Sequence, residues 1–204
     1  MPKIVDKEEK KIEILRVAVD IFYQHGIEQR SMKHIASDLG MARSSLYSYF
    51  RSREDILRFA LSYAIREFDI IKKELLRAPG PAREKIATFF SSSLYLDESI
   101  RKAITVVIEY LLLRRGKQQV LDSQVHDLSM HIRTLFLSIL RQGVERGELR
   151  DHDTGKLSNI LYALTESMLL HKTFEDGIYL TVDAHTVDMI LWRVLKNTRQ
   201  GVEQ

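Results

Sequence analysis

The chain has 204 residues, of which 45% are apolar and 29% are charged, enough for a buried core beneath a well-solvated surface. It contains no cysteine, which excludes a disulfide framework, thiolate metal sites and a cysteine nucleophile. The net charge of +3 at pH 7 is informative only through its distribution along the chain.

Basic residues concentrate between Arg30 and Arg53. Five basic residues against one acidic residue give this segment a net charge of +4, so the other 180 residues carry −1. A local basic patch on a nearly neutral chain is typical of a nucleic-acid-binding module. Charge alone leaves a second interpretation open, namely a solvated basic face.

Neither the start of the chain nor its apolar runs predict export or membrane insertion. Residues 1–11 are rich in charge and have no apolar core, so we expect no signal peptide there. The longest uncharged run, residues 86–96, contains three serines and is too short to span a bilayer. We therefore expect a cytoplasmic protein.

Apolar residues recur at spacings of three and four along most of the chain, which predicts helices almost throughout. The first helix is expected over about residues 6–24, with Gly26 ending it in a left-handed conformation. Ser31 is expected to be the N-cap of a short second helix. Gly40 interrupts the pattern before a third short helix at about residues 42–49.

A longer helix opens at Ser52-Arg53-Glu54-Asp55, a capping-box variant with the shorter acid, and stops before Pro79-Gly80-Pro81. Residues 178–182 are strand-like but have no evident partner, so we expect a loop there. The fold class is predicted to be all-α with about nine helices. The remaining helices are expected at about residues 82–96, 98–114, 118–146, 153–175 and 183–199.

Residues 31–49 meet the demands of a helix-turn-helix. Such a motif needs a small residue where its two helices touch and a turn residue able to adopt positive φ, and Ala36 and Gly40 supply them. Apolar side chains must also pack both helices against the rest of the domain. The candidates for this role are Ile35, Leu39, Met41 and Leu46. The face left exposed on the second helix of the motif carries Arg43, Ser44, Ser45, Tyr47 and Ser48.

Residues 12–57 resemble the DNA-binding domain of the TetR family of bacterial regulators. The resemblance covers about a quarter of the chain in detail, and the remainder matches only in length and helical character. It implies a helix-turn-helix DNA-binding domain over residues 1–54 and an effector-binding and dimerisation domain over residues 55–204. The matching positions are Ala18, Phe22, Gly26, Ile35-Ala36, Leu39-Gly40-Met41, Leu46-Tyr47-Ser48-Tyr49-Phe50 and Ser52-Arg53-Glu54-Asp55-Ile56-Leu57.

The resemblance implies a DNA-contacting role for eight residues: Ser31, Lys33, Arg43, Ser44, Ser45, Tyr47, Tyr49 and Arg53. Residues 43–45 would reach base edges, and Arg43 could grip guanine O6 and N7 bidentately. The other five would meet phosphates. Arg53 stands where the family usually has lysine, and the helix N-terminus there would help to hold the anion. Ser45 stands where the family often has glycine, so no operator sequence is implied.

Three alternatives stay open for this motif. Tyr47 could instead be a core residue with its hydroxyl satisfied internally. The serines of residues 44–48 could form a tolerant surface without a role. The helix-turn-helix could serve only protein contact, which predicts indifference to DNA and fits poorly with the +4 patch.

The resemblance implies a dimer with a small-molecule effector in the second domain. Apolar stripes over residues 157–168 and 187–195 could pair with their symmetry mates, although one stripe could simply cover the monomer core. An apolar or aromatic effector is suggested by Phe89, Phe90, Tyr95, Tyr110, Phe136, Tyr162, Met168 and Phe174. The candidate effector-binding set is Phe89, Phe90, Tyr110, Phe136, Tyr162 and Met168, any of which could be plain core instead.

We expect that the protein binds no metal or other cofactor and that it is not an enzyme. Asp122/His126 and Asp127/His131 are each four residues apart, but surface or capping roles account for them better than a metal site. The chain has no nucleophile elbow, glycine-rich phosphate loop or HExxH motif. The expected function is a regulator, most simply a repressor released from a palindromic operator by its effector, with activation as the alternative.

Overall fold

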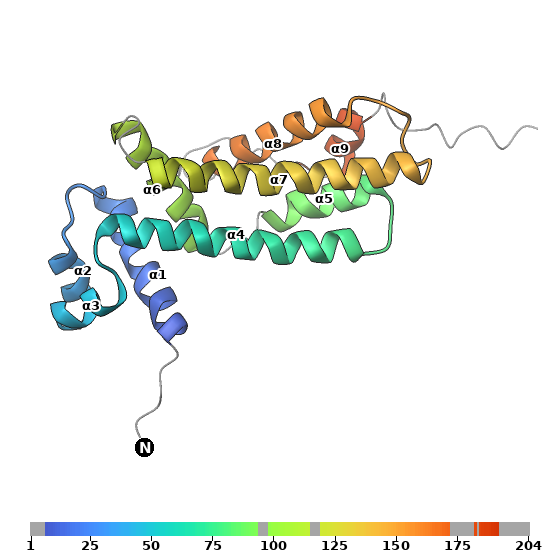
Figure 1. The fold of residues 1–204 in the computed structure, drawn as a ribbon. Coiled ribbons are helices and arrows are strands. Elements are labelled where there is room, and N and C mark those ends of the chain that lie inside the picture. Colours follow the sequence, from blue (N-terminus) through green and yellow to red (C-terminus); the bar gives the residue numbers. More distant parts are fainter. Residues whose placement is uncertain (1–6, 94–97, 115–118, 172–181, 183, 192–204) are drawn as a thin grey trace, which may run out of the picture. The chain divides into compact units, whose positions relative to one another are not determined.

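The computed structural model describes residues 7–93, 98–114, 119–171, 182 and 184–191, and these residues form nine helices and no strand (Figure 1). The all-α prediction is therefore confirmed. No helix within these ranges is long and apolar enough to cross a membrane. The helices are α1 Lys7–His25, α2 Met32–Asp38, α3 Arg43–Tyr49, α4 Arg53–Arg77, α5 Ala82–Ser93, α6 Glu98–Arg114, α7 Gln119–Glu145, α8 Thr154–His171 and α9 Ala184–Leu191.

The predicted helix boundaries agree with the structure to within about two residues wherever both ends are described. Gly26 (φ +77°) ends α1, and its N–H donates to the carbonyl of Phe22 at 2.8 Å. Gly80 (φ +115°) lies in the proline-flanked turn that follows α4. The predicted ends of the helices at residues 96, 175 and 199, and most of the predicted 178–182 loop, lie outside the described residues.

The chain divides into two compact units. The first comprises the described residues of Met1–Arg66 and Asp97–Leu128, and the second those of Glu67–Leu96 and Ser129–Gln204. The predicted domain boundary after residue 54 falls in the first turn of α4, inside the first unit. A functional division of the chain at that point remains a prediction.

In the first unit, α1 packs against both α2 and α6. Apolar residues on one face of α1 are fully buried, among them Ile14, Ala18 and Phe22. On its outer side, Asp20 accepts a hydrogen bond from Lys102 of α6 at 2.7 Å. Hydrogen bonds from Lys102 to Asp20 and Glu98 raise the pKa of Lys102.

In the second unit, α5 packs against α9, and an aromatic cluster fills the interior. The Phe89 ring lies 4.8 Å from that of Phe136 and 5.7 Å from that of Phe90, both in edge-to-face geometry. The turn before α5 is held at two points. The N–H of Ala82 donates to Glu148, and buried Lys85 donates to the carbonyl of Leu76 at 3.2 Å.

Candidate nucleic-acid interface

The helices α2 and α3 pack together through a short turn centred on Gly40, as the sequence predicts. Gly40 has φ +61°, and Ala36 is 3% exposed. The turn is closed by the N–H of Gly40 donating to the carbonyl of Ser37 and that of Met41 donating to the carbonyl of Ala36. This confirms that residues 32–49 form the two helices and the turn of a helix-turn-helix.

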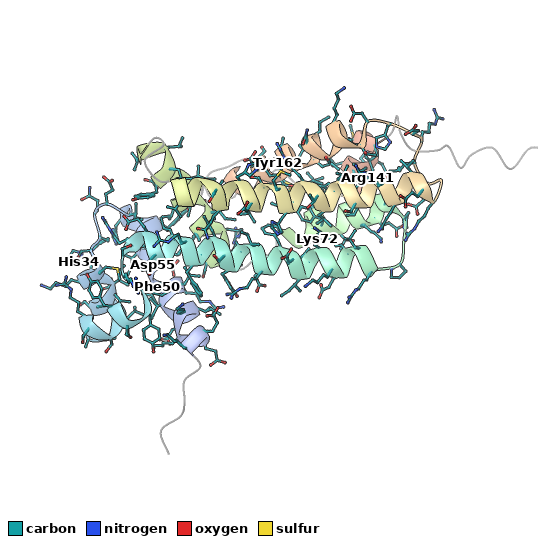
Figure 2. The ribbon with its side chains drawn as sticks, viewed as in Figure 1. His34, Phe50, Asp55, Lys72, Arg141 and Tyr162 are labelled. Carbon is teal, nitrogen blue, oxygen red and sulfur yellow. The ribbon has the colours of Figure 1, made fainter. Side chains whose placement is uncertain are left out.

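Two buried residues anchor α3 to its unit, and the sequence predicts one of them, Leu46. Leu46 is fully buried, and Phe50 packs edge-to-face against Phe59 of α4 with 5.4 Å between ring centroids. Figure 2 marks Phe50 close to the junction of α3 and α4. Of the predicted apolar anchors, Ile35 is also fully buried, whereas Leu39 and Met41 are half-buried beside the turn.

The opposite face of α3 is exposed and polar. Arg43, Ser44, Ser45 and Ser48 are all exposed, and Tyr47 is 39% exposed, so the interpretation of Tyr47 as a core residue is wrong. The guanidinium carbon of Arg43 lies 5.3 Å from the centroid of the Tyr47 ring, and its Nη2 donates to the Tyr47 hydroxyl at 3.3 Å. The two side chains therefore form one stacked pair.

The start of α2 presents Ser31 and Lys33, both exposed. Ser31 is the N-cap, as predicted, and its backbone N–H donates to Nδ1 of His34 at 3.2 Å. The role of His34 is absent from the sequence prediction because glutamate or glutamine usually occupies this capping position. The available signal was its spacing of three residues from the N-cap.

The remaining two predicted DNA contacts are half-buried: Tyr49 at the end of α3 and Arg53 at the start of α4. Nη1 of Arg53 donates to the backbone carbonyl of Ile27 and, at 3.2 Å, to that of Arg30. Both carbonyls belong to the connection between α1 and α2. Sequence reasoning missed these bonds because backbone acceptors 23 and 26 residues away leave no trace in a local pattern.

The first turn of α4 is capped by its own side chains. Asp55 donates its backbone N–H to Oγ of Ser52 at 3.2 Å, and its carboxylate accepts the N–H of Arg51 at 2.9 Å. The predicted capping box is therefore present, with Asp55 reaching one residue beyond the N-cap. Figure 2 marks Asp55 at this junction.

Glu54, in the same turn, accepts a hydrogen bond from the hydroxyl of Tyr110 of α6 at 2.9 Å. Burial alone would raise the pKa of Glu54. Hydrogen bonds from its own backbone N–H, from Tyr110 and from Ser52, together with the positive charge of Arg53, outweigh burial and hold the pKa below its ordinary value.

The six candidate effector-binding residues do not lie in one cluster. Phe89, Phe90 and Phe136 form the aromatic cluster of the second unit and have no exposed surface. Tyr110 belongs to the first unit and is bonded to Glu54. Tyr162 and Met168 lie buried on α8, while Tyr95 and Phe174 are outside the described residues.

Tyr162 belongs to a polar group on α7 and α8. Its hydroxyl is 2.7 Å from Ser129 Oγ and donates to Glu166 at 2.7 Å, and the guanidinium of Arg133 lies 4.9 Å from its ring centroid. Burial, followed by the nearby Glu166, raises the pKa of Tyr162. Figure 2 shows Tyr162 on α8 above α7.

Among the residues that the structure describes, no three histidines or acids come together as a metal-ion cluster would. The side chain of Asp122 lies outside the described residues. Its predicted partner His126 is exposed, as is Asp127. His131 instead faces Asp69 of α4, with 3.7 Å between Nε2 and Oδ1.

Comparison with known proteins agrees with this geometry. Residues 14–59 match the model for bacterial regulatory proteins of the tetR family. The chain is 24% identical over 148 residues to the fatty acid metabolism regulator protein of Bacillus subtilis, covering 71% of this chain and 73% of the relative.

Solved structures of two regulators share the fold. The ketosteroid transcriptional regulator KstR2 of Mycobacterium tuberculosis superposes with a TM-score of 0.68 at 20% identity, covering 92% of this chain and 96% of the other. A transcriptional regulator from Saccharomonospora viridis in complex with choline superposes with a TM-score of 0.71 at 19% identity, covering 93% and 100%. Over residues 14–59 the chain is thus similar to the bacterial regulatory proteins of the tetR family, and over most of its length it shares the fold of these two regulators.

Proposed function

We propose that this regulator is a repressor that binds an inverted-repeat operator as a homodimer and leaves it when a small molecule binds. One observation carries the DNA-binding part of the proposal. The second helix of the helix-turn-helix, α3, is anchored by buried Leu46 and turns an exposed polar face, including a stacked arginine, away from the domain.

Seven residues of α3 and of the start of α2 are the proposed DNA contacts: Ser31, Lys33, Arg43, Ser44, Ser45, Tyr47 and Tyr49. Arg43 reads a base, because its planar fork matches the O6 and N7 acceptors of guanine. Ser31 and Lys33 meet phosphate at the start of α2, and the two tyrosine hydroxyls do so from α3. Arg53 differs from these seven, since its Nη1 is bonded to two backbone carbonyls.

A homodimer follows from the reach of a single recognition helix, which contacts too few base pairs for a specific site. Exposed apolar side chains on the last two described helices support this: Ile160 of α8 is 54% exposed and Met189 of α9 is 62% exposed. Leu161, Val187 and Leu191 face the interior of their own unit, so part of each predicted stripe covers the monomer core.

The effector is proposed to be an apolar or aromatic small molecule bound in the second unit. The rings of Phe89, Phe90 and Phe136 have no exposed surface in this structure, so such a ligand would have to separate them before they could serve as its apolar wall. The choline complex of the Saccharomonospora viridis relative supports a small-molecule role for this fold. An effector that favours one conformation of the protein would weaken operator binding by its difference in affinity between the two conformations.

The experiment is selection of the purified protein against random duplexes at two salt concentrations. Enrichment of an inverted repeat, with affinity that falls steeply as salt rises, supports a dimeric DNA reader. Without enrichment, or with binding indifferent to salt, the proposal fails and a protein-contact role for the helix-turn-helix takes its place. The enriched duplex then reports release of DNA when apolar and aromatic compounds are screened.

A further inference from the structure

The residue at the head of α4 departs from the TetR pattern, because Arg53 stands where lysine is usual. A lysine there is expected to meet a DNA phosphate. In this chain the arginine side chain turns to the protein instead. Its Nη1 donates to the carbonyl oxygens of Ile27 and Arg30, in the connection between α1 and α2.

Donor counting limits what this nitrogen can still do. Both carbonyls accept hydrogen bonds from Nη1, which carries two of the five N–H groups of the guanidinium. Nη1 is therefore engaged with the protein, and only the three N–H groups on Nε and Nη2 are left for another acceptor. A lysine carries one flexible ammonium in place of the planar fork, so the change from lysine to arginine alters geometry as well as preserving charge.

The carbonyls that Arg53 binds lie in the short connection that joins α1 to the start of α2. Gly26 ends α1 in the left-handed conformation, buried Ile27 follows it, and Ser31 begins α2 as its N-cap. One guanidinium thus ties the whole connection to the first turn of α4. The proposed phosphate contacts Ser31 and Lys33 come directly after this tethered segment.

We propose that Arg53 is a positioning residue, which holds the start of α2 in its DNA-binding orientation and does not neutralise a phosphate. The inference rests on the proposed DNA-binding function. A fixed connection lets Ser31 and Lys33 meet the DNA backbone without first ordering the segment that carries them. Loss of the tether therefore weakens binding while the number of phosphate contacts stays the same.

The test compares Arg53→Lys with Arg53→Gln on the selected duplex over a range of salt concentrations. For a positioning residue, both variants lose affinity by a similar factor, on the order of tenfold, and the slope of log K against log salt is unchanged. For a phosphate contact, Arg53→Gln makes the slope shallower by about 0.9 while Arg53→Lys stays near the wild type. That second pattern overturns the inference.

Lys33→Gln is the matched control. Because Lys33 is an exposed, proposed phosphate contact in α2, its replacement should make the slope of log K against log salt shallower by about 0.9.

Hydrogen exchange at the amides of residues 27–35 gives a readout independent of DNA. Faster exchange in both Arg53 variants supports the tether, and exchange equal to the wild type overturns it. If the wild type itself shows no salt-dependent DNA binding, the proposed function fails, and hydrogen exchange still decides the role of Arg53. Should Arg53→Gln fail to fold, Arg53→Lys carries the exchange comparison.

Discussion

Arg43 and Tyr47 lie one turn apart on the exposed face of α3, and the contact between them restrains the arginine before any DNA is present. The guanidinium stacks on the Tyr47 ring and donates to its hydroxyl. A free arginine side chain loses much conformational entropy when it binds. Because the Arg43 guanidinium is already held against the Tyr47 ring, it loses less conformational entropy at the DNA surface. Under the proposed function, Tyr47 would thereby support base reading by Arg43 as well as contact a phosphate.

Replacement of Arg43 by alanine should relax sequence discrimination at one base pair. A bidentate arginine–guanine contact contributes about 1–3 kcal/mol of discrimination, so affinities for the operator and for its variant at that position should converge. Binding to a panel of single-base operator variants measures this. Tyr47→Phe, which keeps the ring but removes the hydroxyl, should retain the preference. Uniform weakening of Arg43→Ala across the whole panel would instead identify Arg43 as a backbone contact.

At the scale of the helices, the first turn of α4 joins two elements of the first unit. Arg53 reaches the connection between α1 and α2, and the adjacent Glu54 holds the hydroxyl of Tyr110 on α6. Tyr110 is 1% exposed, so its bond to Glu54 satisfies a hydroxyl that is buried away from water. The Glu54–Tyr110 bond therefore stabilises α6 against α4 most strongly while Glu54 is ionised.

Tyr110→Phe should lower the free energy of unfolding at pH 7 by about 1.5–3 kcal/mol, the usual loss for a hydrogen bond to a charged group. Since the folded pKa of Glu54 is held below its ordinary 4.5, its contribution is complete above that value and is lost as the pH falls through the folded pKa. The difference between wild type and variant should thus shrink below pH 4.5. Urea unfolding at a series of pH values measures it, and a difference independent of pH would contradict an ionised acceptor.

The packing of α5 against the end of α7 predicts an unusual penalty at Gly143. A Cβ at this helical glycine would lie 2.8 Å from Cβ of Ala82 and 2.9 Å from Cδ1 of Leu149. Gly143→Ala gains about 1 kcal/mol of helix propensity, but overpacking costs about 1–3 kcal/mol, so thermal unfolding should show a net loss of stability. Gly155→Ala in α8 is the matched control. Its Cβ meets nothing closer than 3.4 Å, and it should be neutral or stabilising.

The sequence predicted helices and caps well because both depend on local spacing. Ser31, Gly26 and Gly40 occupy the cap and turn positions assigned to them, and Leu46 is buried as expected. Contacts between distant segments were not predictable. No local pattern pairs Arg53 with the carbonyl of Arg30, or Tyr110 with Glu54. The sequence alone therefore places Tyr110 in one candidate set with Phe89 and Phe136. In the structure Tyr110 belongs to the first unit, and the two phenylalanines belong to the second.

At the scale of the whole molecule, the proposed function depends on whether two copies of the chain associate. Ile160 on α8 and Met189 on α9 expose more than half of their surface, although neighbouring residues on the same helices are buried. A second copy of the chain would remove this apolar surface from water, as in an isologous interface. Association would also bring two recognition helices to one inverted repeat.

Ile160→Asp should therefore shift the protein from dimer to monomer, because a carboxylate cannot be buried in an apolar interface without a partner. Losing the second half-site should reduce affinity for the inverted repeat by on the order of 100-fold while affinity for a single half-site stays unchanged. Sedimentation equilibrium and binding to the two duplexes measure both effects. Ile70→Asp is the matched control, since Ile70 on α4 is 50% exposed against 54% for Ile160. If both variants remain dimeric, the dimer interface lies elsewhere on the chain. If both dissociate, the added negative charge itself causes dissociation, and the result does not place Ile160 in the interface.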